Sequence, residues 1–143
     1  MAQSYKTIHD FQSLNVSDSL LSVTRAGTGA TLGSLQSGNL ITLNSTTGSL
    51  ITLPAPTVGF SFPFVVAALG AHTITAPTST LFGAINCAVP TAGSTLNVCS
   101  ATGSSVLLTT AGSSIGDRIT IVSDGVNYYI SGTVAHFNSI KFA

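Results

Sequence analysis

The distribution of charge constrains this chain more than any other feature of its sequence. No Asp, Glu, Lys or Arg occurs from Ala26 to Gly116, which is 91 of the 143 residues. Natural β-sheet proteins protect exposed strand edges with charged side chains, Lys above all. A β-rich segment of this length must therefore protect its edges differently. Closure into a barrel would do so, and burial against further copies or a larger assembly would do so too.

The overall composition excludes several classes of function. Charged residues make up 6% of the chain, against about 25% in an average soluble domain, and the formal net charge is zero. This leaves no basic patch for DNA, RNA or anionic lipid. The longest apolar run, residues 64–71, is far shorter than the roughly 20 residues of a membrane-spanning helix. We expect neither a nucleic acid nor a membrane as partner.

Short apolar runs separated by Gly, Pro, Asn and Ser extend along the chain, a pattern typical of strands joined by turns. The predicted strands are Leu20–Thr24, Leu40–Leu43, Leu50–Leu53, Phe60–Val66, His72–Thr75, Leu81–Ala88, Thr95–Cys99, Val106–Thr110, Arg118–Ser123, Val126–Ser131 and Ser139–Phe142. Residues 8–20 could hold one short helix. The pattern predicts an all-β fold with little or no helix, either an antiparallel β-sandwich of jelly-roll type or a small β-barrel.

Two sequence features predict hairpins. Asp124-Gly125 lies between alternating apolar runs and suits a type I′ turn, in which both central residues need positive φ. The sequence Leu-Ile-Thr-Leu occurs within both residues 39–43 and residues 49–53. We interpret these two copies as the similar strands of one hairpin rather than as turns of a solenoid.

Three phenylalanines at period two share one face of a predicted strand. Phe60, Phe62 and Phe64 are therefore expected in the core. Pro63 lies among them and has no N–H to donate to a neighbouring strand. This predicts that the strand is at an edge of its sheet or is interrupted at the proline.

The chain divides into an N-terminal arm and linker, residues 1–35, and a β-sandwich domain, residues 36–143. Half of the charges fall in the first 25 residues, and Gly27–Gly33 has the composition of a flexible linker. The alternative is that residues 20–24 add an edge strand to their own domain.

No motif in the sequence predicts catalysis or metal binding. Gly112–Gly116 matches G-x-S-x-G around Ser114, but a nucleophile elbow needs a helix after it, and a strand is predicted there. His9, His72 and His136 are too far apart in sequence for a zinc pattern and are expected to be ordinary surface or core residues. We expect no cofactor.

The two cysteines lie on predicted neighbouring strands. A disulfide between Cys87 and Cys99 would close a loop of about a dozen residues and restrict the unfolded chain. The alternative is two thiols that pack as small apolar groups. In a protein that folds in a reducing cytoplasm they would stay reduced.

A succession of short motifs resembles a known family. Leu50-Ile-Thr-Leu-Pro54 is followed by Gly59-Phe-Ser-Phe62, by Thr73-Ile-Thr75, and finally by Gly116-Asp-Arg-Ile-Thr-Ile-Val-Ser-Asp-Gly-Val-Asn-Tyr-Tyr-Ile-Ser-Gly132. This order is similar to a β-rich domain of tailed-phage virion proteins, found in head-decoration proteins and in head or tail fibres. The resemblance covers residues 48–132, and the family has no catalytic residues to carry over.

The resemblance implies a structural role in the virion. We expect a capsid decoration, or cement, protein that is made in the host cytoplasm and binds the major capsid protein at capsomer junctions. Zero net charge favours association, and the family is usually trimeric, so a homotrimer is expected. The alternative is a receptor- or glycan-binding fibre domain, for which Tyr5, Tyr128 and Tyr129 are the candidate stacking residues.

The N-terminal segment is expected to dock on the capsid or on a neighbouring subunit. Phe11 and Leu14 would be its apolar anchors, and Lys6 and Arg25 would pair with acidic groups of the partner. A segment with so few apolar residues gains little by folding alone, but it could become ordered on a partner surface.

Overall fold

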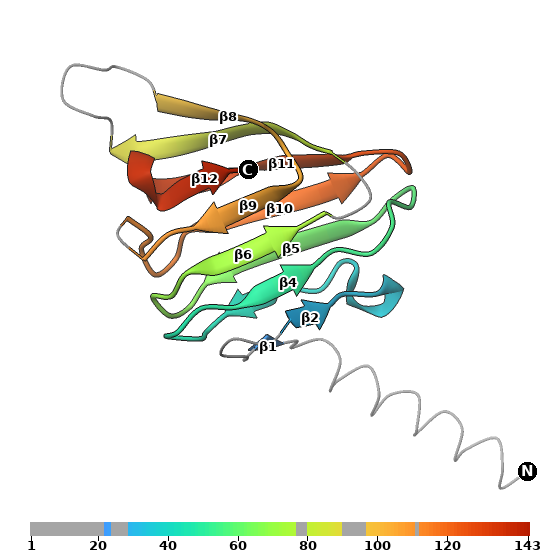
Figure 1. Ribbon diagram of the computed structural model, residues 1–143, viewed down its shortest axis with the longest axis horizontal. Helices are drawn as coiled ribbons and strands as arrows, with labels where there is room; N and C mark the ends of the chain where they lie inside the picture. The colour runs from blue at the N-terminus through green and yellow to red at the C-terminus, as the bar shows by residue number, and fades with distance from the viewer. Residues whose placement is uncertain (1–21, 24–28, 77–79, 90–96, 111) are drawn as a thin grey trace, which may run out of the picture.

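The chain folds into two β-sheets that face each other (Figure 1). The computed structural model describes residues 22–23, 29–76, 80–89, 97–110 and 112–143. Sheet A has the strand order β1-β3-β5-β10-β11-β7-β8, and sheet B has the order β12-β9-β6-β4-β2. The strands are β1 Ser22–Val23, β2 Gly29–Thr31, β3 Ile41–Leu43, β4 Leu50–Thr52, β5 Ser61–Val66, β6 His72–Thr75, β7 Leu81–Val89, β8 Asn97–Gly103, β9 Ser105–Leu108, β10 Arg118–Ser123, β11 Tyr128–His136 and β12 Ile140–Phe142.

The predicted all-β sandwich is confirmed. Within the described ranges, the only helical segments are two short 3-10 turns, η1 Ser34–Gln36 and η2 Phe137–Ser139. The barrel alternative is wrong, because the two sheets do not close on each other. Both sheets are mixed, with parallel as well as antiparallel pairs, so the strand pairing differs from the antiparallel arrangement expected.

The first six strands alternate between the two sheets. The odd-numbered strands β1, β3 and β5 pair in parallel in sheet A, and β2, β4 and β6 pair in parallel in sheet B. Paired residues such as Gly29 and Leu50, or Leu50 and Thr73, are 21 and 23 positions apart. The N-terminal half is thus wound as successive coils, each made of one strand in sheet A and one strand in sheet B. The predicted hairpin of residues 39–43 and 49–53 is wrong, because β3 and β4 belong to opposite sheets.

The inner faces of these coils form the core. In sheet B, Ile51 pairs with Ile74, and both are fully buried. In sheet A, Ile41 pairs with the buried Phe64. Parallel stacking places similar side chains above one another, so each coil buries its apolar residues only when the next coil is present.

The C-terminal half closes the sandwich with mainly antiparallel strands. In sheet A, β10 pairs with β5 on one side and with β11 on the other, and β11 continues in parallel to β7. In sheet B, β9 pairs with β6 and β12. The strands β10 and β11 therefore lie in the interior of sheet A, and their outward-facing residues form the middle of its outer face.

Part of the expected linker is a strand. Gly29–Thr31 forms β2 and pairs with β4, and Leu32 after it is buried. The expectation that Gly27–Gly33 is flexible is therefore wrong for these residues, because backbone pairing and the burial of Leu32 fix them. Ser22–Val23 forms β1 at the edge of sheet A, as the edge-strand alternative predicts. The helix considered for residues 8–20 lies outside the described residues.

The connection between β10 and β11 differs from the predicted type I′ turn. Among the described residues only glycines have positive φ, so Asp124 does not adopt the conformation that a type I′ turn requires. The loop instead spans 124–127, and the Asp124 Oδ1 atom accepts hydrogen bonds from the Val126 and Asn127 N–H groups at 2.8 and 2.7 Å. Gly125 supplies the positive φ of 97°.

The phenylalanine prediction is confirmed, but the inference from Pro63 is wrong. Phe62 and Phe64 are fully buried, and Phe60 packs edge-on against Phe62 with ring centroids 5.7 Å apart. The strand β5 is interior rather than an edge. It tolerates Pro63 because pairing with β3 begins only at Phe64, so no neighbour on that side needs the missing N–H.

The register of sheet B predicts losses of stability of very different size for two adjacent residues of β4. Ile51→Ala should lower the free energy of unfolding by about 2–5 kcal/mol, because it leaves a cavity between the sheets. Leu50 is 44% exposed on the outer face, so Leu50→Ala should cost much less, about 0.5 kcal/mol. Denaturant unfolding measures both, and a larger loss for Leu50→Ala would contradict the register.

Candidate docking surfaces

Three loops at one end of the sandwich carry the most exposed large apolar side chains in the described part of the chain. They are Leu35 in η1, Val58 before β5 and Val126 before β11, with 77%, 78% and 71% of their surface exposed. In Figure 1 all three connections lie on the side of the molecule where β10 ends, with the connections before β5 and β11 next to each other and η1 farther down, beside β2. We call Leu35, Val58 and Val126 the apolar loop end.

Backbone hydrogen bonds hold these loops to the sheet. Gly38 N donates to Ser61 O at 2.7 Å, which fixes the segment after η1 beside β5. Gly59 N donates to Ser123 O at 3.2 Å, which joins the Val58 loop to the end of β10. The apolar side chains are therefore presented by a preorganised surface, which lowers the entropy cost of docking.

A carboxylate organises the loop beside Val126. Asp124 accepts two backbone N–H bonds on Oδ1 and the Tyr129 hydroxyl on Oδ2 at 2.9 Å. These hydrogen bonds hold the pKa of Asp124 below its ordinary value, and the bond from the Asn127 N–H has the largest effect. The Tyr129 hydroxyl donates to the ionised form, and this bond together with the charge raises the pKa of Tyr129.

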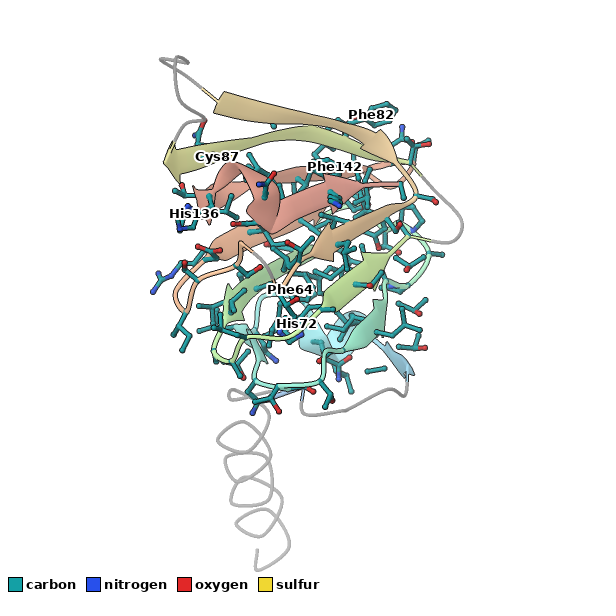
Figure 2. The ribbon with its side chains drawn as sticks, turned by 60° about the vertical axis from the view of Figure 1, so that its left-hand side comes forward. Phe64, His72, Phe82, Cys87, His136 and Phe142 are labelled. Atoms are coloured by element: carbon teal, nitrogen blue, oxygen red, sulfur yellow. The ribbon has the colours of Figure 1, made fainter. Side chains whose placement is uncertain are left out.

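The outer face of sheet A carries an aromatic pair. Tyr129 is 42% exposed, and its ring lies 6.2 Å from that of Phe82, the residue opposite it on β7. Figure 2 shows Phe82 projecting away from the core that contains Phe64. Of the tyrosines expected to stack on a glycan, Tyr128 is ruled out: it is fully buried, and its hydroxyl donates to Pro54 O at 3.0 Å. Tyr5 lies outside the described residues.

A hollow of about 370 Å³ lies farther along the same two strands. The exposed Arg118 and the hydroxyl-bearing Thr120, Ser131 and Thr133 line it from β10 and β11. Arg118 is opposite Thr133, and Thr120 is opposite Ser131, so their side chains share the outer face. Within the described ranges, none of these four side chains has a hydrogen-bond or ion-pair partner.

Asp117 borders the hollow but serves the backbone. Its side chain is buried, Oδ1 accepts the Ala135 N–H at 2.8 Å, and Oδ2 accepts the Ser114 N–H at 2.9 Å. Both carboxylate oxygens accept a hydrogen bond, so Asp117 holds the loop before β10 against the C-terminal end of β11.

The serine and histidines considered for catalysis and metal binding have ordinary structural surroundings. Ser114 is followed by strand β10 rather than by the helix that a nucleophile elbow needs. His72 is a core residue, with Nδ1 3.3 Å from Ser49 Oγ and Nε2 3.1 Å from Ala68 O (Figure 2). His136 is exposed at the end of β11. In the described ranges, no three His, Cys, Asp or Glu side chains gather as a metal site.

The two cysteines lie on neighbouring strands, as expected. Cys87 is opposite Asn97, and Cys99 is opposite Ile85, so the cysteines occupy diagonal positions on β7 and β8. Diagonal Cα atoms are about 7–8 Å apart, whereas disulfide-bonded pairs usually have Cα atoms about 4.4–6.8 Å apart. This register favours the thiol alternative, and the state of the pair stays a prediction.

The predicted docking arm lies outside the described residues, so Lys6, Phe11, Leu14 and Arg25 stay predictions. Sequence reasoning missed the apolar loop end. The available signal was a lone apolar residue inside each turn-forming segment, such as Val58 between Pro56 and Gly59. That signal is weak because single exposed apolar residues are common.

Comparison with known proteins adds no relative: no family model, curated protein or solved structure matches this chain. Among the described residues, no helix has the length and hydropathy to cross a membrane.

Removing the Asp117 carboxylate should destabilise the fold. Asp117→Ala leaves the partly buried backbone N–H groups of Ser114 and Ala135 without acceptors, at a combined cost of about 1–3 kcal/mol. Denaturant unfolding measures the loss, and Thr120→Ala on the same strand is the control with little expected effect. An unchanged unfolding midpoint for Asp117→Ala would show that the carboxylate does not hold this loop.

The Asp124–Tyr129 bond predicts a pH effect. Asp124→Asn removes the charge that opposes phenolate formation, so the pKa of Tyr129 should fall toward its ordinary value. The near-ultraviolet absorbance of phenolate follows the titration, and Tyr129→Phe identifies which step belongs to this residue. Burial raises the pKa of Tyr128, and that step should not move. An identical titration in Asp124→Asn would contradict the assigned bond.

Proposed function

We propose that this chain is a structural protein of a tailed-phage virion that decorates the head as a cement protein. The sequence resemblance over residues 48–132 supports the family, and the β-sandwich agrees with it. The proposed partner is the major capsid protein, bound at the junctions between capsomers. The protein would be made in the host cytoplasm and reside on the capsid surface.

The apolar loop end is the single observation that carries this proposal. It presents Leu35, Val58 and Val126 from three loops that the sheet holds in place. Val58 lies beside Gly125 of the Val126 loop, and contiguous exposed apolar side chains mark surfaces that bind another protein. A cement protein needs such a surface because it gains binding energy by burying apolar area across a junction of the shell.

The lack of charge suits permanent docking. Asp124 is the only charged residue in the three loops, so little charge has to be desolvated when this end meets a partner. Desolvation of unpaired charge is the main cost of burying a polar surface. A surface that is apolar at its centre and rich in hydroxyl groups around it can remain in contact over a wide range of salt concentration.

We further propose that the protein is a homotrimer. Four strands form the sheet edges, and of their residues only Lys141 on β12 is charged. The edge strands β1, β2 and β12 are two or three residues long, but β8 is seven residues long. Closed cyclic symmetry would cover such surfaces without open-ended growth.

Charge placed on the apolar loop end should abolish capsid binding. The double variant Val58→Asp with Val126→Asp should retain its fold, because both side chains are exposed, yet fail to bind phage heads assembled without the protein. Co-sedimentation with these heads measures binding. The matched control is Ile115→Asp, 70% exposed at the opposite end of β10, which should bind normally. Normal binding by the double variant would contradict the proposed docking end.

Light scattering coupled to size-exclusion chromatography tests the trimer. At micromolar concentration we expect one species of three times the 14.4 kDa chain mass. A stable monomer would refute the trimer while leaving the docking end untouched, since the two proposals use different surfaces.

A further inference from the structure

The two ends of the outer face of sheet A carry different groups, and the capsid-docking proposal uses neither of them. At one end of β10 and β11 lie the Tyr129 and Phe82 rings, and at the other lies the hollow around Arg118. Arg118 and Val122, the residue opposite Tyr129, are four positions apart on β10. At about 3.3 Å per residue this separates the two features by roughly 13 Å along the strand.

The groups between the two ends suit sugar hydroxyls. Thr120 and Ser131 face each other across β10 and β11, and their hydroxyls have no partner among the described residues. At the aromatic end, Asp124 Oδ2 accepts one hydrogen bond, from Tyr129, and a carboxylate oxygen can accept two. Rows of hydrogen-bonding groups beside an exposed ring match the polar edges and apolar faces of a pyranose.

The charged residues of this face indicate the charge of a ligand and its orientation. Arg118 is exposed, and the nearby Asp117 carboxylate has both oxygens occupied by backbone N–H groups. A guanidinium binds carboxylates through paired hydrogen bonds. Asp124 at the opposite end would repel an anion, so a carboxylate on the ligand would lie at the Arg118 end.

We propose that this face binds a short acidic oligosaccharide. A sugar ring stacks on Tyr129 beside Phe82, its hydroxyls meet Thr120 and Ser131, and a uronic-acid carboxylate meets Arg118. One cation is too few for a nucleic-acid backbone, which would need several phosphate contacts. The site adjoins the apolar loop end at the Asp124 loop but uses none of Leu35, Val58 and Val126, so variants at those three residues and at Arg118 test the two proposals separately.

Calorimetric titration of the full chain tests the proposal with two matched probes. Tetragalacturonate carries the carboxylates, and its methyl ester is the same chain without the charge. We expect tetragalacturonate to bind more tightly than the ester. Arg118→Gln should weaken the acid about tenfold and leave the ester unchanged, and Tyr129→Ala should weaken both about tenfold. Lys141→Gln, the other described cation, on sheet B, is the control and should change neither.

Several outcomes would overturn the proposal. Absence of binding to both probes would refute a saccharide site, and equal affinity for acid and ester would refute the role of Arg118. Tighter binding of single-stranded oligothymidylate than of tetragalacturonate would reassign the face to nucleic acid. None of these results bears on capsid binding, which Val58 and Val126 test separately.

Discussion

Packing of the two inner sheet faces against each other is the interaction on which the rest of the structure depends. Because β1 to β6 alternate between the sheets, each coil contributes residues to both inner faces, as Ile41 and Ile51 do. A one-residue slip in register would turn every inward side chain outward. The same register brings three loops together at one end and turns Tyr129 and Arg118 to the outer face of sheet A.

A sandwich of this kind explains how a long charge-free segment can fold. The coils satisfy the backbone groups of interior strands by pairing, and the strands exposed at the edges are mostly short. Short edge strands are one of the ways in which natural sheets limit unwanted pairing. Charge is thus not the main protection in this chain, and the few charged groups that are described serve local purposes, such as the acceptor role of Asp117.

Most strand positions followed from the sequence, as did the neighbouring pairs β10–β11 and β7–β8, but β2 and the partners of the first six strands did not. His72–Thr75 and Arg118–Ser123 were predicted with the observed bounds, because alternation and turn residues are local signals. Pairing among the first six strands joins residues 20 or more positions apart, so the two copies of Leu-Ile-Thr-Leu were wrongly joined in a hairpin. The candidate surfaces were less predictable still. Tyr128 and Tyr129 are adjacent and chemically identical, and only the register shows that the first is buried and the second exposed.

We propose that this chain covers the outside of a phage head and meets the shell with the end that carries Leu35, Val58 and Val126. A cryo-electron microscopy map of the intact particle tests it most directly. We expect density for the two-sheet sandwich at the junctions between capsomers, with that loop end turned toward the shell. Density for the chain only at the tail, or at the junctions with the opposite end, near Ile115, against the shell, would contradict it.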